Sequence, residues 1–212
     1  MKKMDLEYWK RVIERLNETF KEREGKLCSY DGAIGDGDHG TSMVFGFSEA
    51  MKALAGMPVS DVGDLFCTVG NAFINSVGGV TGIIFGTMFL NAGRNAAGKS
   101  ELTTEDLHGI LFESLNAVMK AGNVTEGQKS MVDAFAPAVR ALGNAVQGGA
   151  TAASALALAH RAAGEGMEAT SNMKAGVGRG RYQADKGIGH IDAGAASVEL
   201  IFDVFSAEYS RE

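Results

Sequence analysis

The stretch 129–146, KSMVDAFAPAVRALGNAV, decides how this chain folds. Its apolar side chains recur at intervals of three and four residues, which places them on one face of an α-helix. A helix with one apolar face must bury that face against another element, so the pattern predicts a helical packed domain. The residues of this face are Met131, Ala134, Phe135, Ala138, Val139, Leu142 and Val146.

The same spacing recurs along most of the chain. It predicts helices at 5–23, 41–55, 60–75, 82–97, from Thr103 onward, 129–146, 150–174 and 194–209. Clear alternating strands between turn signals are missing, and only 2 prolines interrupt the 212 residues. No linker or low-complexity segment divides the sequence. We therefore expect an all-α fold and a single domain over residues 1–212.

The composition excludes several classes of protein. Hydrophobic residues make up 45% and charged residues 22%, which is typical of globular proteins. The net charge of −6 disfavours binding to nucleic acid or an anionic membrane. No apolar run approaches the roughly 20 residues of a membrane span, and the charged N-terminus lacks the apolar core of a secretory signal. Two cysteines without a pairing or metal motif favour a reduced, cytoplasmic setting.

The connections between the predicted helices fall into two kinds. If successive helices run antiparallel, alternate connections lie at the same end of the bundle. The connections after the second, fourth and sixth helices are short and chemically bland: GMPVS, GKSEL and QGGA. Those after the first, third, fifth and seventh contain KLCSYDGAIGDGDHG, SVGGVTG, GNVTEGQK and GVGRGRYQADKGIGHID. This segregation predicts a binding or active site at one end.

Three carboxylates stand out at that end. Asp31, Asp36 and Asp38 lie among glycines in one short segment, and such a group repels itself unless a cation joins it. Oxygen ligands select Mg²⁺ or Ca²⁺. An EF-hand loop beginning at Asp36 is excluded, because its twelfth residue is Phe47 rather than Glu. Mg²⁺ shared with phosphate oxygens fits better, and a solvated acidic turn is the alternative.

Two predicted helix starts carry the features of anion sites. Gly40-Thr41-Ser42 opens the second helix and Gly78-Gly79-Val80-Thr81-Gly82 opens the fourth. Each offers free backbone N–H groups, a hydroxyl group and the positive end of a helix dipole, and the glycines allow close approach of an anion. Beside three carboxylates, two such starts favour a metal–phosphate site.

Four other side chains have both a functional and a structural interpretation. Arg179 either clamps a phosphate or only contributes surface charge. His190 is a ligand, an acid–base group or a structural residue. His39 is the better functional candidate of the two histidines, because its sequence neighbours are polar or glycine. Met131 is most simply a core residue, with a role as an adenine platform as the alternative.

Four separated motifs, in this order, resemble the L subunit of dihydroxyacetone kinase (DhaL) over nearly the whole chain. They are DGAIGDGDHG at 31–40, SVGGVTG at 76–82 followed by FGT at 85–87, GQKSMVD at 127–133, and GRGRY at 178–182 followed by IGHIDAGA at 188–195. The resemblance implies an antiparallel eight-helix barrel that holds a nucleotide at one end.

The resemblance also implies roles for individual residues. Asp31, Asp36 and Asp38 would bind the Mg²⁺ ions that hold ADP or ATP. Arg179 and His39 are the candidate catalytic residues. The implied phosphate contacts are His39, Gly40, Thr41, Ser42, Gly79, Val80 and Thr81. The implied surroundings of the remaining nucleotide are Gly122, Met131, Arg179, Asp192, Ala193 and Gly194.

By this resemblance the chain transfers the γ-phosphate of Mg-ATP to a small ketose, which a separate K subunit holds covalently through a histidine. The nucleotide either exchanges in each cycle or stays bound as ADP, to be rephosphorylated by a phosphotransferase-system M subunit. A homodimer is left open. Two other functions also remain: a Mg²⁺-dependent hydrolase of a phosphoester or nucleotide-linked sugar, and a non-catalytic, nucleotide-bearing regulatory module.

Three positions depart from the family pattern. Thr81 replaces a serine and keeps the hydroxyl group. Asp192-Ala193-Gly194 stands where Asp-Pro-Gly is usual, which removes a rigid turn. Residues 177–182 read VGRGRY in place of KGRASY, so that a lysine is lost and Arg181 is gained. We interpret these changes as a hint of another ketose, such as a tetrulose.

Overall fold

The computed structural model describes residues 3–211, and most of them are helical. The strands β1 (Met4–Asp5) and β2 (Glu101–Leu102) have two residues each, and the short 3₁₀ helices are η1 (Thr170–Asn172) and η2 (Gly180–Tyr182). The all-α prediction is therefore confirmed. The α-helices are α1 (Leu6–Ile34), α2 (His39–Gly56), α3 (Val62–Ser76), α4 (Gly79–Asn95), α5 (Thr104–Gly122), α6 (Val132–Gln147), α7 (Ala152–Ala169) and α8 (Ala193–Ser210).

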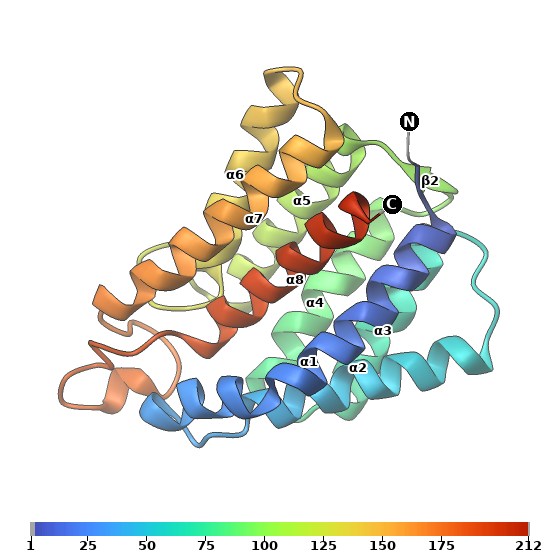
Figure 1. Cartoon of the computed structure of the whole chain (residues 1–212). Helices are drawn as coiled ribbons and strands as arrows, with labels where there is room; N and C mark the ends of the chain where they lie inside the picture. Colours follow the sequence, from blue (N-terminus) through green and yellow to red (C-terminus); the bar gives the residue numbers. More distant parts are fainter. Residues whose placement is uncertain (1–2, 212) are drawn as a thin grey trace.

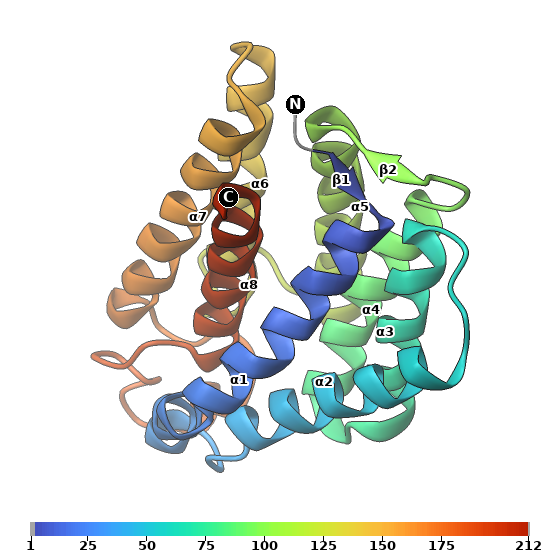
Figure 2. The same cartoon turned by 45° about the vertical axis from the view of Figure 1, so that its right-hand side comes forward.

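The helices form a closed antiparallel ring. Successive helices run in opposite directions (Figure 1). Each helix contacts the next one in sequence, and α8 returns to contact α1. Figure 2 shows α6, α7 and α8 on one side and α3, α4 and α5 on the other, with α1 running between them. This arrangement agrees with the expected eight-helix barrel.

Aromatic side chains hold the ring together from the inside. Trp9 on α1 is fully buried, and its ring lies 5.1 Å from that of Phe66 on α3 and 5.2 Å from that of Phe205 on α8. Burying one such ring contributes roughly 1.5–3 kcal/mol. Six of the seven apolar residues that define the face of 129–146 are buried, and Val146 is partly buried. That stretch forms α6, as predicted.

The first helix is longer than predicted, which changes the setting of one carboxylate. The prediction ends at residue 23, whereas α1 continues to Ile34. Its apolar face extends through Leu27 and Ile34, both buried, and Gly25 does not interrupt it. Asp31 consequently belongs to the last turn of a helix rather than to a loop.

Other helix boundaries differ by a few residues. Helix α4 begins at Gly79 rather than at 82, and α2 begins at His39 rather than at 41. Helix α7 ends at Ala169, where the prediction continued to 174. A buried threonine, Thr170, starts η1 at that point. The earlier starts of α2 and α4 bring their glycines into the first helical turn.

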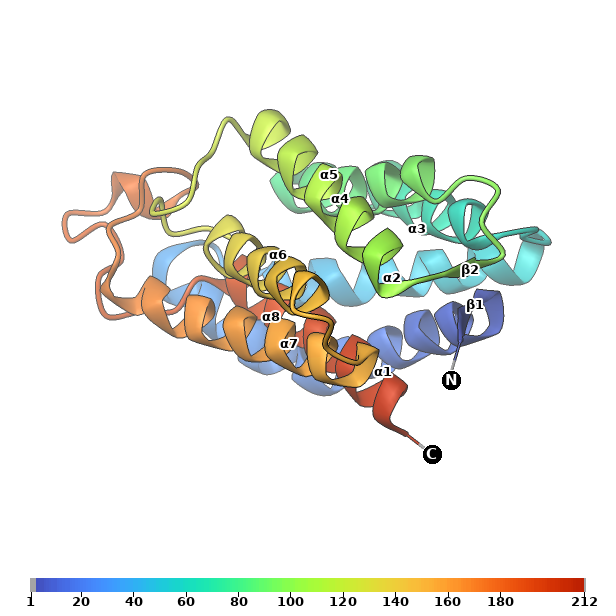
Figure 3. The same ribbon diagram turned by 90° about the horizontal axis from the view of Figure 1, so that it is seen from above.

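The two ends of the barrel differ as the connections suggested. At one end, β1 pairs antiparallel with β2 and joins the start of α1 to the α4–α5 connection; these short strands were not predicted. At the other end, the α5–α6 connection and the long α7–α8 connection lie together (Figure 3). Within residues 3–211, no helix is both long and apolar enough to cross a bilayer.

Candidate functional site

Three carboxylates at the α1–α2 junction form the centre of the candidate site. One oxygen atom from each of Asp31, Asp36 and Asp38 lies within 4.8 Å of the others. Asp31 is half-buried, whereas Asp36 and Asp38 are exposed. Among the described residues, this is the one group of acidic, histidine or cysteine side chains spaced to share a cation. The structure thus brings together the three residues that the sequence singled out, which we call the carboxylate triplet.

The turn between α1 and α2 is wrapped around Asp31. Its Oδ2 atom accepts hydrogen bonds from the backbone N–H groups of Gly37, at 2.8 Å, and Asp38, at 3.0 Å. Gly37 has a φ of 79°, in the left-handed region that favours glycine. Asp31 therefore orders the turn that carries the other two carboxylates.

Three helices that begin at this end lack the cap that the other helices have. No side-chain cap hydrogen bond is made by Asp38, Gly78 or Met131, the N-cap residues of α2, α4 and α6. A helix start has free N–H groups and a partial positive charge, so an uncapped start attracts anions. The N-cap side chains that do accept such a bond are Asp5, Asp61, Thr103, Thr151 and Asp192, before α1, α3, α5, α7 and α8.

Arg179 reaches the carboxylate triplet from the α7–α8 connection. Its Nη2 atom lies 2.7 Å from Oδ2 of Asp36, and its side chain is 72% exposed. The residue before it, Gly178, has a φ of 66° and open space around it. The guanidinium group of Arg179 thus lies beside the carboxylate triplet, and the structure joins this residue to the predicted site.

His39 occupies the first position of α2, but its ring lies inside the barrel. The side chain is buried, and Nε2 is 2.8 Å from the hydroxyl group of Ser197 on α8. Its ring lies 6.0 Å from that of Phe85 on α4. Burial lowers the pKa of the imidazole to about 4, although Asp38 acts in the opposite direction. The neighbours of His39 in sequence are polar or glycine, but its ring packs inside the barrel against Ser197 and Phe85. A catalytic role for His39 stays a prediction.

The first turn of α2 is held tightly against α1. The hydroxyl group of Thr41 donates to Oε1 of Glu24 at 3.0 Å. At Gly40, a Cβ atom would overlap the carbonyl oxygen of Glu24 and lie 2.8 Å from Sγ of Cys28. Sequence analysis missed Glu24, because its partners lie on the next helix and no local pattern marks it.

The start of α8 lies beside the start of α6. A Cβ atom at Gly194 would lie 3.3 Å from that of Met131, which is buried. Asp192 accepts a hydrogen bond from the N–H group of Ala195 at 2.8 Å, and burial raises the pKa of its carboxyl group to about 6. Ala193 is the first residue of α8. The structure thus brings together Met131 and the 192–194 segment.

The predicted residues on α4 and α5 lie at the same end of the barrel. Gly79, Val80 and Thr81 form the first turn of α4, and Val80 is 73% exposed. Gly122 ends α5, and a Cβ atom there would lie 3.4 Å from the side chain of Ile84 on α4. Their contacts with phosphate or nucleotide stay predictions.

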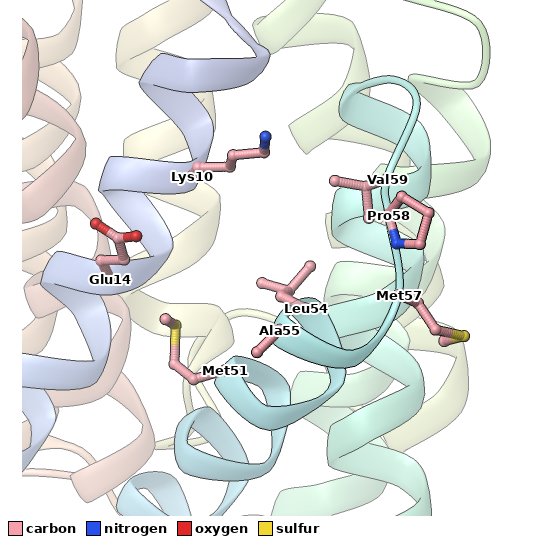
Figure 4. Close-up of a pocket in the computed structure, with 8 residues that line it drawn as sticks. All are labelled: Lys10, Glu14, Met51, Leu54, Ala55, Met57, Pro58 and Val59. Atoms are coloured by element: carbon pink, nitrogen blue, oxygen red, sulfur yellow. The ribbon is translucent and has the colours of Figure 1, made fainter.

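A separate cleft of about 380 Å³ is lined by none of the three carboxylates. Figure 4 shows the residues that line it. It is formed by the first third of α1, the end of α2 and the connection to α3. Its lining is mostly apolar, with Lys10 and Glu14 as the charged residues, so it does not gather groups suited to a polyphosphate. The apolar residues lining it are Met51, Leu54, Ala55, Met57, Pro58 and Val59.

The fold and the site define an all-α barrel that carries, at one end, three carboxylates spaced to bind a cation and helix starts without side-chain caps. The chain belongs to the DAK2 domain family, whose pattern matches residues 33–207. It is 33% identical over 198 residues to the ADP-binding subunit DhaL of PEP-dependent dihydroxyacetone kinase 1 from Listeria innocua, covering 93% of this chain and 94% of that protein. The resemblance to the L subunit is thereby confirmed.

Two longer proteins contain a similar region. The D-erythrulose kinase of Mycolicibacterium smegmatis is 28% identical over 192 residues, which cover 90% of this chain and 33% of that protein. The crystal structure of the dihydroxyacetone kinase from C. freundii, in complex with AMP-PNP and Mg²⁺, superposes with a TM-score of 0.72 at 24% identity. That match covers 92% of this chain and 33% of the other, and it supports the fold.

Proposed function

We propose that this chain is the nucleotide-binding subunit of a ketose kinase. It binds Mg-ADP or Mg-ATP at the carboxylate triplet and transfers the γ-phosphoryl group to a small ketose held on a separate K subunit. The observation that carries this proposal is the convergence of Asp31, Asp36 and Asp38 within 4.8 Å, beside the uncapped start of α2.

The donor set of the carboxylate triplet suits Mg²⁺. All three groups are hard carboxylate oxygens, and two of them are exposed, which leaves room for phosphate oxygens and water in the coordination shell. When bound there, Mg²⁺ would neutralise charge on the phosphates. The N–H groups at the starts of α2 and α4 would face the same anion.

Arg179 is the residue best placed to act on the transferred group. Phosphoryl transfer spreads charge over the transferred oxygens, so catalysis depends on positioning and on charge stabilisation. The guanidinium group lies next to Asp36 and is exposed, which allows it to approach a phosphate bound at the carboxylate triplet. No nucleophile from this chain is required for this chemistry.

The state of His39 argues against this residue as the base of a hydrolase. A hydrolase needs a base that activates water. The imidazole of His39 is 8% exposed, lies against Ser197 and has a pKa of about 4, so it is a weak base with little access to solvent. We therefore assign His39 a structural role: its buried ring holds the first turn of α2 against α8. His190, the other candidate base, is exposed.

The name of the L. innocua relative supports a partner subunit. That protein is an ADP-binding subunit of a kinase, and this chain covers 94% of it. A ketose-binding K subunit would hold the substrate. The name of the L. innocua protein favours a PEP-dependent cycle, in which ADP stays bound and an M subunit rephosphorylates it. Dihydroxyacetone and a tetrulose such as erythrulose are the candidate substrates.

Native mass spectrometry and calorimetry test this function. The purified chain should carry ADP with Mg²⁺, and the nucleotide should survive extensive dialysis if ADP stays bound through the cycle. Asp36→Asn should bind Mg-ADP at least about tenfold more weakly, which corresponds to about 1.4 kcal/mol. The control is Glu113→Gln, an exposed carboxylate on α5, which should bind like the parent.

Three results would contradict the proposal. Equal affinity of Asp36→Asn and the parent would remove the metal assignment. Release of phosphate or sugar from a phosphoester by the chain alone would favour the hydrolase. Nucleotide binding without phosphoryl transfer to any ketose-loaded K subunit would favour a regulatory module.

A further inference from the structure

Lys129 is a buried lysine in the connection between α5 and α6. It is only 2% exposed, and its φ of 58° lies in the left-handed region, where residues other than glycine are uncommon. Lysine is rarely buried unless its charge is paired, because removing an ammonium group from water is costly. The function proposed above does not explain this position.

The ammonium group of Lys129 joins two distant parts of the chain. Nζ donates to the carbonyl oxygen of Thr170, at 2.6 Å, and to that of His190. Thr170 starts η1 directly after α7, and His190 lies just before α8. The two ends of the α7–α8 connection are therefore fastened to one side chain.

Backbone hydrogen bonds close the same junction. The N–H group of Asp192 donates to Oγ1 of Thr170 at 3.0 Å, and that of Gly189 donates to the carbonyl oxygen of Ser171 at 2.7 Å. A Cβ atom at Gly187 would lie 3.1 Å from Cε of Lys129. The connection 173–191 therefore forms a loop with a closed base, and Lys129 lies in that base.

Charges around Lys129 balance it within the protein. Burial lowers the pKa of its ammonium group, while Asp192, Asp133 and Asp185 act to raise it. Asp192 caps α8, and Asp133 lies in the first turn of α6. The ammonium group therefore interacts with acidic side chains at the starts of two helices, Asp133 of α6 and Asp192 before α8.

The loop fastened in this way carries Arg179. Gly180 packs near Ile34, at the end of α1, and the side chain of Gln183 donates to the carbonyl oxygen of Ala33 at 3.5 Å. Arg179 then reaches Asp36. The position of the guanidinium group therefore depends on where the base of the loop is held.

We propose that Lys129 is a positioning residue: its ammonium group fastens the 173–191 loop and the start of α8 so that Arg179 and the 192–194 segment face the carboxylate triplet. This inference rests on the proposed function for its nucleotide readout, and it has a second readout that does not.

The first test compares Lys129→Met with Lys174→Met. Each variant loses one positive charge, but Lys174 is exposed on the same loop and makes no hydrogen bond or ion pair with the residues that the structure describes. We expect Lys129→Met to bind Mg-ADP at least about tenfold more weakly than Lys174→Met. Amide hydrogen exchange should become faster in 173–191 and stay unchanged in α3. Lys129→Arg, which keeps a charged donor, should recover most of the affinity and protection.

The outcomes separate this inference from the proposed function. Equal Mg-ADP affinity and equal exchange in folded Lys129→Met and Lys174→Met would overturn it, and so would a Lys129→Arg variant no better than Lys129→Met. If the parent itself binds no Mg-ADP, the proposed function has failed, and the exchange contrast alone decides whether Lys129 fastens the loop.

A measurement on the parent protein covers the case in which Lys129→Met does not fold. Exposed lysine ammonium groups exchange rapidly with water, whereas one held by two carbonyl oxygens exchanges slowly. Side-chain ¹⁵N spectra near neutral pH should show one protected ammonium signal that disappears in Lys129→Arg. A spectrum without a protected ammonium signal would rule out the fastening.

Discussion

The guanidinium group of Arg179 and the carboxylate of Asp36 lie 2.7 Å apart and connect the α7–α8 loop to the α1–α2 junction. Their side chains are 72% and 39% exposed. Exposed ion pairs of this kind contribute about 0–1 kcal/mol to stability. The contact therefore adds little to the stability of the fold. Its importance is that it holds the guanidinium group beside the carboxylate triplet.

Arg179→Gln should reduce phosphoryl transfer without changing stability. Removing a donor that stabilises developing charge costs about 10²–10³-fold in turnover. The thermal midpoint should stay within about a degree of the parent, because little stability resides in the ion pair. Turnover with a ketose-loaded K subunit and a thermal melt measure the two quantities. Arg161→Gln, which removes an exposed arginine paired with Glu165 on α7, should leave both unchanged; unaltered turnover in Arg179→Gln would exclude the assigned role.

Two glycines, Gly40 in the first turn of α2 and Gly25 within α1, should respond in opposite ways to the same substitution. Gly40→Ala places a Cβ atom against the carbonyl oxygen of Glu24, and such overpacking costs about 1–3 kcal/mol. Gly25→Ala meets nothing within 4 Å in the middle of α1, so it should stabilise the protein by about 0.5–1 kcal/mol through helix propensity. Denaturant unfolding measures both, and equal effects would show that the helices do not approach closely at Gly40.

Ala193→Pro should stabilise the protein. Ala193 is the first residue of α8, where proline is favoured because its N–H group has no partner within the helix. Asp192 has φ −74° and ψ 126°, which suits a residue before proline. The expected gain is about 0.4–1 kcal/mol from the reduced freedom of the unfolded chain. Thermal melts of the parent and variant test this, and a destabilised variant would mean that the cap of α8 differs from the one described.

His39 should make stability depend on pH. Its folded pKa of about 4 lies below the unfolded value of 6.5, so the unfolded state binds a proton first as the pH falls. The contribution is present in full above pH 6.5, is lost as the pH falls towards 4, and amounts to about 3 kcal/mol. His39→Gln keeps a polar partner for Ser197 but cannot titrate, so the unfolding free energy of the parent minus that of the variant should rise by about 3 kcal/mol from pH 4 to pH 6.5.

Asp192 acts in the opposite direction and must be considered in that measurement. Its folded pKa of about 6 exceeds the unfolded value of 3.8, so its ionisation reduces stability as the pH rises between these values. This effect is common to the parent and His39→Gln. The difference between the two curves therefore isolates His39, and a constant difference from pH 4 to pH 6.5 would contradict the burial of its ring.

The fold was largely predictable because its information is local. The apolar face that begins near Met131 forms α6 almost as predicted, and Thr103 caps α5 with a capping box. The end of α1 was not predictable in this way. The prediction ended this helix at residue 23, but burial of Leu27 and Ile34 continues it. Tertiary packing there overrides local propensity.

The site was predictable where its residues are close in sequence and hidden where they are not. Asp31, Asp36 and Asp38 share one segment, so their spacing alone suggested a cation site. The ring of His39 bonds to Ser197, and the ammonium group of Lys129 bonds to carbonyl oxygens of Thr170 and His190. These partners lie far away in sequence, and two of the contacts involve backbone atoms that no residue type reveals.

The continuity of α1 gives the carboxylate triplet one fixed and two adjustable members. Asp31 is carried on a rod of 29 residues, about 43 Å long, whose inner side is embedded in the core over most of its length. Adding a residue within that rod would rotate Asp31 by about 100° around the helix axis. Adding one between 32 and 35 would leave Asp31 in place and change its spacing from Asp36 and Asp38, so the length of one short turn sets how the three carboxylates meet.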